Sequence, residues 1–376
     1  MKHKTIITVL LVLALALSAL LGGCQGKTVL AATVGDREIT VQQLKASYTN
    51  GLSYASYYGY DTSTEEGAAA YRDYMLDSLI ATNMKVYQAK LAGITLTQEE
   101  QDAAAETGKK NYDDTVQSFV DQATQAGASN PEAYAKTLMT KALVSNKTTV
   151  SKLKATMLED AVNETLISKH KDVLLEGVAL TEDELAAKYT EELAAQKELF
   201  TSDPSEYFTY ESYSSYGYSV MPLFVPDGFF RVRQILVADE ATALVVKQKL
   251  DAGEDFEALL KEYNTDPGMQ GEANAAGYLV GTGAGFVTEF LDAALALKNN
   301  GDVSDPVQSE YGWHIIKRVS TEPSREIAYA DVKEALDTYE QAQYQAQYYS
   351  DIIAKWVADT TLVTKYPDNY ASIGKN

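Results

Sequence analysis

Cysteine and histidine are scarce in this chain. Among 376 residues there is one cysteine, and there are three histidines. Without a second thiol no intramolecular disulfide can form, so packing has to stabilise the folded state. Neither a zinc site nor a Cys–His catalytic pair has the residues that it needs. We therefore expect no metal and no other cofactor.

Basic residues are also in short supply. Asp and Glu number 53 against 32 Lys and Arg, which gives a net charge of −21. A chain this acidic repels nucleic acid and anionic lipid, so we expect no nucleic-acid partner. Residues 281–285 form a glycine-rich run, but they lack the lysine that follows in a phosphate-binding loop.

The longest hydrophobic run lies at the N-terminus. Lys2 and Lys4 precede an apolar stretch, residues 6–21, that is shorter than the roughly 18–20 residues of a membrane-spanning helix. This pattern predicts a signal peptide over residues 1–23. The sequence Leu-Gly-Gly-Cys that ends at Cys24 resembles the bacterial lipobox, in which the cysteine receives a diacylglycerol. We expect lipid on Cys24, with an ordinary secretory peptide as the alternative.

Helix signals dominate the chain from residue 40 to residue 200. Thr40, Thr97 and Thr181 are each followed three residues later by Gln or Glu, which is the capping box of a helix start. Apolar residues fall at helical spacing over 71–91 and 153–175. We predict a helical domain over residues 24–200 that begins with a short strand.

Tyrosine is abundant, with 26 copies, and it clusters. Segment 201–228 combines three prolines with five tyrosines, at positions 207, 210, 213, 216 and 218. We predict a linker or loop here. Tyrosine offers amphipathic area that suits a binding surface, but a linker packed on its own aromatic rings fits the pattern equally well. A second cluster, at positions 54, 57, 58 and 60, has the same two interpretations.

Residues 229–320 change to a mixed pattern. Strand signals at 229–237 and 313–319 flank helical ones. The chain is helical again in the segment 321–376, whose apolar face needs a partner, and the N-terminal helices are the most economical one. The predicted fold class is α+β, with a mostly helical domain formed by the N- and C-terminal segments and an inserted domain at 229–320.

Seven segments of the inserted region resemble the parvulin pattern in order and spacing: Val232–Val237, Gly253–Phe256, Tyr263–Asp266, Gly277–Leu279, Glu289–Phe290, Gly301–Val307 and Tyr311–Lys317. Residues 34–40 resemble the N-terminal segment of SurA and PrsA chaperones, and the lipobox favours PrsA. The resemblance implies a small antiparallel sheet surrounded by helices, with prolyl isomerase activity. It also implies a lipid-anchored foldase on the outer face of the cell membrane that assists unfolded or folding secreted polypeptides. A homodimer is compatible with it.

The resemblance also assigns site residues. The pocket for the substrate proline would be formed by Leu279, Phe286 and Phe290, with Phe286 in place of the usual methionine. The polar catalytic cluster would comprise Gln234, Asp266, Tyr311 and His314. Gln234 stands where the family has its first histidine. Residues 276–280 read Ala-Gly-Tyr-Leu-Val where the family usually has Gly-Gly-Asp-Leu-Gly.

The glutamine at position 234 leaves three functions open. Glutamine cannot change charge near neutral pH as imidazole can, but it keeps a donor and an acceptor. The first hypothesis is a foldase that binds unfolded chains and has weakened isomerase activity. The second is an active isomerase. The third is a non-catalytic adaptor that docks an envelope or secretion component through the tyrosine-rich segment.

Some of these residues also have a purely structural interpretation. His314 could merely tie the sheet together, and Asp266 before Pro267 could form a turn. Phe286 and Phe290 would be core residues in either case. His170, at the end of a helical stretch, is predicted to lie at the surface or to cap the helix.

Overall fold

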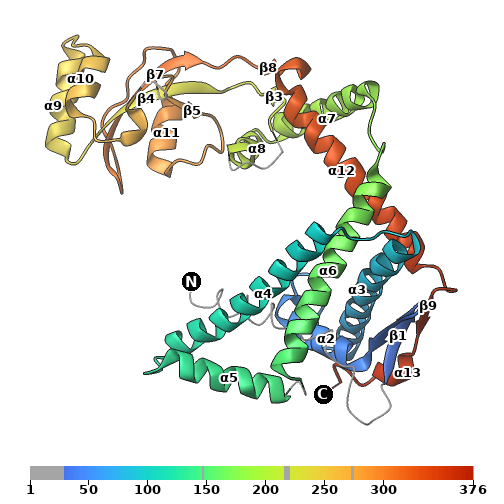
Figure 1. The fold of residues 1–376 in the computed structure, drawn as a ribbon. Coiled ribbons are helices and arrows are strands. Elements are labelled where there is room, and N and C mark those ends of the chain that lie inside the picture. Colours follow the sequence, from blue (N-terminus) through green and yellow to red (C-terminus); the bar gives the residue numbers. More distant parts are fainter. Residues whose placement is uncertain (1–28, 146–147, 216–220, 272–274, 376) are drawn as a thin grey trace. The chain divides into compact units, whose positions relative to one another are not determined.

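The computed structural model describes residues 29–145, 148–215, 221–271 and 275–375. Its contacts divide the chain into two units (Figure 1). One unit combines residues 1–178 with 345–376, and the other is 179–344. Cys24 and the predicted signal peptide, residues 1–23, lie outside the described residues, as do Tyr216 and Tyr218.

Both ends of the chain meet in a three-stranded antiparallel sheet of the first unit. β1 (Leu30–Val34) lies between β2 (Arg37–Thr40) and β9 (Val363–Lys365). α13 (Pro367–Tyr370) packs on β1, as Figure 1 shows. The prediction that the N- and C-terminal segments build one helical domain is confirmed.

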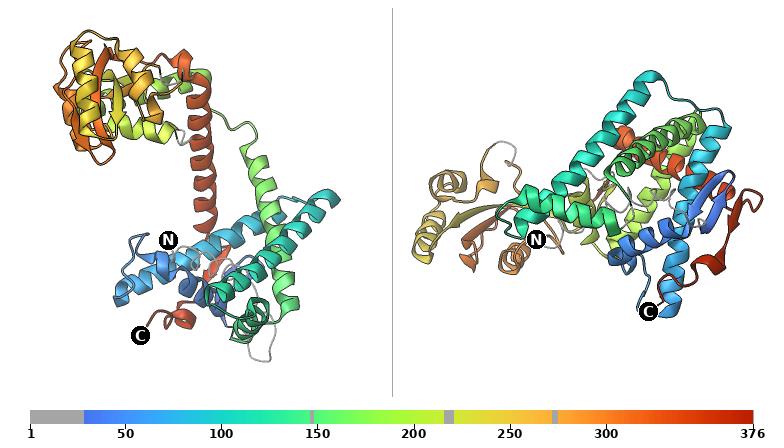
Figure 2. Two further views of the ribbon diagram at one scale, coloured as in Figure 1. Left: turned by 90° about the vertical axis from the view of Figure 1, so that its left-hand side faces the viewer. Right: turned by 60° about the horizontal axis from the view of Figure 1, so that its bottom comes forward.

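Helices make up most of this unit. They are α2 (Val41–Ala55), α3 (Glu65–Leu91), α4 (Gln98–Gln125), α5 (Pro131–Ser145) and α6 (Val150–Leu175). Thr40 and Thr97 open α2 and α4 with the predicted capping boxes. α2 and α3 cover the sheet, with Leu44, Leu76 and Ile80 buried between them. α4 packs against both α5 and α6 (Figure 2).

The long helix α12 (Tyr329–Val357) returns to this unit from residue 345 onward. Its Trp356 stacks on His170 of α6, and only 6% of His170 is exposed. The prediction that His170 lies at the surface or caps a helix is therefore wrong. The residue that covers it comes from a segment almost two hundred positions away, which local periodicity does not reveal.

The second unit is built on a four-stranded antiparallel sheet in the order β5-β4-β7-β6. Its strands are β4 (Phe230–Val237), β5 (Tyr278–Val280), β6 (Val307–Ser309) and β7 (Gly312–Thr321). α9 (Glu240–Asp251) and α10 (Phe256–Tyr263) pack on one face, over Ile235 and Ile315. α11 (Thr288–Ala296) packs on the other face, over Val232 and Ile316. The α+β class with an inserted small antiparallel sheet is confirmed.

The described parts of segment 201–228, residues 201–215 and 221–228, contain a helix and a strand as well as loop. α7 (Glu182–Ser202) is followed by α8 (Glu206–Ser215), and β3 (Phe224–Val225) pairs with β8 (Arg325–Glu326). Tyr207 of α8 is buried against Phe200 and Phe229, so its ring serves the core. No helix among the described residues is long and apolar enough to cross a membrane.

Candidate functional site

A polar cluster lies on the face of the second unit's sheet that α11 covers. Gln234 of β4 and His314 of β7 are diagonal neighbours, because Gln234 pairs with Ile316 and His314 pairs with Leu236. Side chains two apart on a strand share a face, so the two point the same way. His314 Nδ1 lies 2.6 Å from Gln234 Oε1, and both side chains are buried.

Asp266 completes the centre of this cluster. It caps the short helical turn η1 (Pro267–Met269), where its Oδ1 accepts a hydrogen bond of 2.8 Å from the Gly268 N–H. Asn264 ties this turn to β4, since its Oδ1 accepts from the backbone N–H of Leu236 at 2.9 Å. The turn thereby delivers Asp266 Oδ2 to Gln234 Nε2, which donates at 2.6 Å.

Two hydroxyl groups extend the cluster at its ends. The Tyr278 hydroxyl of β5 donates to Asp266 Oδ2 at 2.9 Å. Ser309 Oγ of β6 lies 2.5 Å from His314 Nε2 and accepts from the backbone N–H of Tyr311 at 3.1 Å. We call the resulting line of five hydrogen-bonded side chains the polar chain: Ser309, His314, Gln234, Asp266 and Tyr278.

The hydrogen bonds of the polar chain are consistent with one direction of proton donation. Gln234 donates from its NH2 group to Asp266 and turns its carbonyl oxygen toward His314. His314 then donates from Nδ1–H and accepts the Ser309 hydroxyl proton at Nε2. A neutral imidazole satisfies both of its partners in this arrangement.

The electrostatic surroundings favour the same protonation states. Burial lowers the pKa of His314, and the nearby charges of Asp266 and Glu289 oppose that shift only in part. Burial raises the pKa of the Tyr278 hydroxyl, and its hydrogen bond to Asp266 raises it further. Tyr278 therefore stays a donor, and His314 stays neutral, at physiological pH.

Aromatic rings line the cluster. Phe286 and Phe290 have ring centroids 5.0 Å apart, and Tyr278 lies 5.3 Å from Phe286. Phe290 also meets the His314 ring nearly at right angles, at 5.4 Å. We call Tyr278, Phe286 and Phe290 the aromatic floor. It keeps water away from one side of the polar chain and offers an apolar surface of the kind that a proline ring can contact.

The structure places two predicted site residues elsewhere. Leu279 points to the opposite side of β5 from Tyr278 and packs with Phe200 and Phe229. The side chain of Tyr311 is 67% exposed, and only its backbone N–H reaches the polar chain. The remaining predicted site residues are brought together: Gln234, Asp266, His314, Phe286 and Phe290.

Two members of the polar chain were missed by sequence reasoning. Tyr278 was interpreted only as a departure from a glycine-rich run, although a tyrosine on an edge strand beside a glycine turn can carry a hydroxyl inward. Ser309 lies two positions before Tyr311, and no motif singled it out. The feature that could have revealed Ser309 is the short strand β6. Its pairing with β7 places Ser309 opposite Gly312 and Val307 opposite His314.

A groove of about 930 Å³ adjoins the aromatic floor. α8 contributes Phe208 and Tyr213 to its wall, and β5 contributes Tyr278 and Leu279. Phe286 borders the groove from the segment that leads into α11. Because Tyr278 belongs to both, a chain lying in this groove would reach the polar chain without crossing the sheet.

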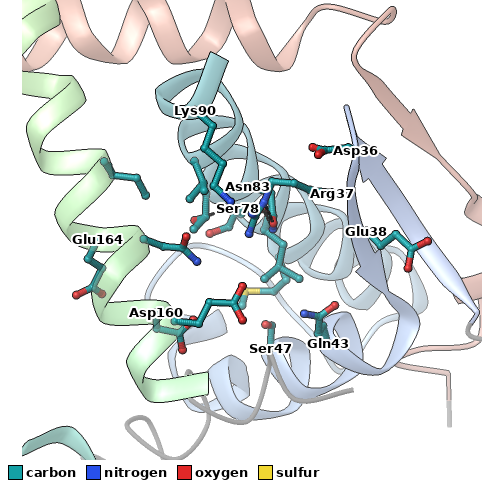
Figure 3. A pocket seen from close by; sticks show the side chains of 17 residues that line it. Asp36, Arg37, Glu38, Gln43, Ser47, Ser78, Asn83, Lys90, Asp160 and Glu164 are labelled. Atoms are coloured by element: carbon teal, nitrogen blue, oxygen red, sulfur yellow. Dashed lines mark hydrogen bonds between the residues drawn. The ribbon is translucent and has the colours of Figure 1, made fainter. Parts of the chain in front are cut away.

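The other unit contains a second cavity, of about 550 Å³, between α3, α6 and the β1–β2 turn. Figure 3 shows Asp160 and Glu164 of α6 on one side of it, and Lys90 and Asn83 of α3 on another. Burial, followed by the charges of Glu159 and Glu164, raises the pKa of Asp160 to about 7. Among the residues that the structure describes, no cluster of His, Cys, Asp and Glu side chains could hold a metal ion.

Comparison with known proteins identifies the sheet-containing unit. Residues 221–334 match the family model of the PPIC-type peptidyl-prolyl isomerase domain. This is a parvulin domain. Part of the chain is similar to PrsA foldases. The polar chain and the aromatic floor both lie within the matched residues of the parvulin domain.

Curated relatives resemble part of this chain. Foldase protein PrsA of Geobacillus kaustophilus (strain HTA426) is 50% identical over 95 residues, which are 25% of this chain and 33% of that protein. Foldase protein PrsA 3 of Bacillus anthracis is 34% identical over 184 residues, 48% of this chain and 56% of that protein. This chain thus spans between a third and somewhat over half of the length of these two relatives.

A solved parvulin structure is also similar to part of this chain. The solution structure of NmPin, the parvulin of Nitrosopumilus maritimus, is 38% identical, covers 25% of this chain and 98% of its own length, and gives a TM-score of 0.22.

Proposed function

We propose that this protein is an extracytoplasmic foldase that binds unfolded or folding secreted polypeptides and whose parvulin domain isomerises prolyl bonds with weakened efficiency. The observation that carries the proposal is the juxtaposition of the polar chain with the aromatic floor inside the parvulin domain. The polar chain offers oriented hydrogen-bonding groups, and the aromatic floor offers an apolar surface. Both adjoin the groove of about 930 Å³, in which we expect a polypeptide segment to bind.

Prolyl isomerisation requires no covalent reaction with these residues. No bond breaks; the peptide must pass a twisted state that has lost its amide resonance, over a barrier of about 18–20 kcal/mol. An apolar surface favours that state by desolvating the amide, and oriented hydrogen-bonding groups can follow the rotating carbonyl. Neither step requires a nucleophile, a metal or another cofactor.

Gln234 is the reason for proposing weakened turnover. Its amide reproduces the connectivity of an imidazole, because it accepts from His314 and donates to Asp266. It cannot, however, take up or release a proton as the charge of the substrate amide redistributes. Binding by the aromatic floor does not depend on this property, so chain binding should be retained when turnover is slow.

The experiment that tests the isomerase part measures cis–trans exchange of a set of proline tetrapeptides by NMR. A rate above buffer that is lost in His314→Ala, with folding intact, supports catalysis. Tyr263→Phe serves as a matched control in the same domain, because the ring of Tyr263 lies beside Lys249 and outside the polar chain. If the exchange rate does not exceed the rate in buffer, the isomerase part of the proposal is wrong.

A separate experiment tests chain binding. The full protein is mixed with an aggregating client that contains no proline, and turbidity is followed. Suppressed aggregation supports a holdase role that does not rest on isomerisation. Unchanged aggregation, combined with measurable prolyl exchange, would favour the alternative of a plain isomerase.

The proposed location rests on the sequence pattern at Cys24, which predicts a lipid anchor at the outer face of the cell membrane. The acidic net charge of −21 supports an anchor by lipid rather than by a basic surface. Cys24→Ser should release the protein from the membrane fraction of a producing cell. Sedimentation of the released protein would then decide whether it is a homodimer.

The adaptor alternative needs an exposed binding surface in the tyrosine-rich segment. Tyr213 is 48% exposed, whereas Tyr207 is part of the core. Deleting the whole segment would therefore disturb the fold, and Tyr213→Ser is the cleaner test. Loss of an envelope partner in that variant, with chain binding intact, would favour the adaptor.

A further inference from the structure

The cavity between α3, α6 and the β1–β2 turn contains charged groups of both signs. Its volume of about 550 Å³ falls within the range of roughly 300–1,000 Å³ that is usual for ligand sites. α6 contributes three acidic residues to its lining, Glu159, Asp160 and Glu164, whereas Arg37 comes from the turn and Lys90 from α3. None of these five side chains forms an ion pair with another residue that the structure describes. Their charges can therefore act on a ligand.

Asp160 is the most buried of the three acidic residues. Asp160 and Glu164 are one helical turn apart, so they share a face of α6, and Figure 3 shows both beside the cavity. Burial and the like charges of Glu159 and Glu164 hold the pKa of Asp160 at about 7, and no cation within the described ranges offsets them. The surroundings thus destabilise this carboxylate, and a bound cation would relieve the repulsion.

Apolar side chains line the same cavity and favour an organic cation. Met75 and Leu79 of α3 and Ile167 of α6 are partly buried there. A lysine or arginine side chain has an aliphatic stem below its charged end, so it can contact these residues while its charge reaches the carboxylates. A metal ion fits less well, because no group of acidic side chains in the described part of the chain could hold one.

Other polar groups of the cavity suit the backbone of a peptide. Arg37 is held against α3 because its Nε–H donates to Asn83 Oδ1 at 2.9 Å, and Lys90 lies in the last turn of that helix. Both basic groups can donate to peptide carbonyl oxygens. Asn163 of α6 also lines the cavity and has no hydrogen bond to the residues described, so its amide can pair with a backbone group.

We propose that this cavity binds a lysine or arginine side chain of a client polypeptide, with the charged end of that side chain against Asp160 and Glu164. Every residue of the lining belongs to the helical unit, so this contact requires neither a proline in the client nor the parvulin domain. The identification of the polypeptide as an unfolded or folding secreted chain rests on the proposed function. The recognition of its basic side chain does not.

A proton and the basic side chain should compete for Asp160. The charged groups that line the cavity around it come from three elements: Glu159 and Glu164 on α6, Asp36, Arg37 and Glu38 on the β1–β2 turn, and Lys90 on α3. With a pKa of about 7, Asp160 is roughly nine-tenths ionised at pH 8 and about one-tenth ionised at pH 6, so a basic peptide should bind about 10-fold more tightly at pH 8. The lysine of the peptide stays charged throughout, since its own pKa is about 10.4.

The test is an NMR titration of the full chain, followed on the acetylated and amidated peptide Gly-Gly-Lys-Gly-Gly, which has no proline and no terminal charge. At pH 8 this peptide should bind at least about 10-fold more tightly than the same peptide with norleucine, which keeps the stem and lacks the charge. Asp160→Asn should bind the lysine peptide about 10-fold more weakly at pH 8, with less than about twofold change between pH 6 and 8. It removes a charge that weakens the fold, so it should fold at least as well as the wild type. Asp172→Asn, exposed on α6 and outside the cavity, is the control and should bind like the wild type.

Three results would overturn the proposal. The first is equal binding of the lysine and norleucine peptides by the wild type, and the second is a lysine preference that persists unchanged in Asp160→Asn. The third concerns n-butylammonium, which has the stem and the charge but no backbone and should bind at least about 10-fold more weakly than the peptide. Equal affinity would show that the occupant is a free amine and not a polypeptide. If the lysine preference is found but client aggregation is unchanged, the chaperone role is wrong and the binding site stands.

Discussion

His170 of α6 and Trp356 of α12 stack face to face, with ring centroids 5.8 Å apart and 6° between their planes. The contact joins two helices that lie far apart in the sequence, and it buries the imidazole. Trp356 also packs against the core around β1. One ring pair thus connects the C-terminal helix to two parts of the helical unit.

Removing the tryptophan should destabilise this unit. Trp356→Ala deletes a partly buried aromatic ring and exposes His170, so the free energy of unfolding should fall by about 2–3 kcal/mol. Tyr348→Ala, on the same helix but 40% exposed, should change it by less than about 0.5 kcal/mol. Urea unfolding of the two variants provides the comparison, and equal losses in both would contradict a specific role of the ring pair.

Asp160, which lines the cavity in Figure 3, should make the free energy of unfolding depend on pH. Asp160 has a folded-state pKa of about 7, against 3.8 for an unperturbed carboxyl group. The folded protein therefore binds this proton more tightly than the unfolded chain, and the carboxyl weakens the fold increasingly as pH rises from about 4 to about 7. Asp160→Asn should raise the free energy of unfolding at pH 8 by about 1–2 kcal/mol, after allowance for partial exposure.

The same variant should have little effect near pH 3, where the carboxyl is largely protonated in both states. Asp172→Asn, exposed on the same helix, is the matched control and should leave the pH profile unchanged. Unfolding measured at several pH values in both variants gives the answer. A gain for Asp160→Asn that is equal at all pH values would show that the titration of Asp160 is not the cause.

Much of the architecture could be predicted because its signals are local. The capping boxes at Thr40, Thr97 and Thr181 each open a helix where the sequence pattern places it. The site was harder to predict, because its geometry depends on strand pairing. Tyr278 and Leu279 are neighbours in sequence, yet the pleat sends one ring to Asp266 and the other side chain to the opposite core. The alternation of side chains along β5 therefore places Tyr278 and Leu279 on opposite faces of the sheet.

The amide at position 234 can be tested by restoring the family residue. Gln234→His should increase the prolyl exchange rate about 10-fold, because an imidazole can share a proton with His314 as the substrate amide twists. Gln234→Leu should abolish exchange, since it leaves His314 and Asp266 without their shared partner. Exchange is measured by NMR on the same peptides, and a slower Gln234→His variant would show that the glutamine is not what limits turnover.

The two faces of β5 predict different effects on peptide binding. Phe286→Ala removes part of the aromatic floor and should weaken binding of a proline-containing peptide about 10-fold, as a buried aromatic contact usually contributes. Leu279→Ala removes a side chain that packs in the opposite core. Because Leu279 also borders the groove, this variant should lower stability and weaken binding less than Phe286→Ala does. Fluorescence titration with a labelled peptide separates the two, and a larger binding loss for Leu279→Ala would reverse the assignment.

The pairing of β1 with β9 also determines when the helical unit can complete its fold during synthesis. Its central strand, β1, is synthesised early, whereas the neighbouring strand β9 is synthesised more than 300 residues later. The helical unit cannot close until residues 363–370 have been synthesised. The parvulin domain has all its strands well before that moment, and domains generally fold as units. The parvulin domain is therefore complete while β1 of the helical unit still lacks one of its partner strands.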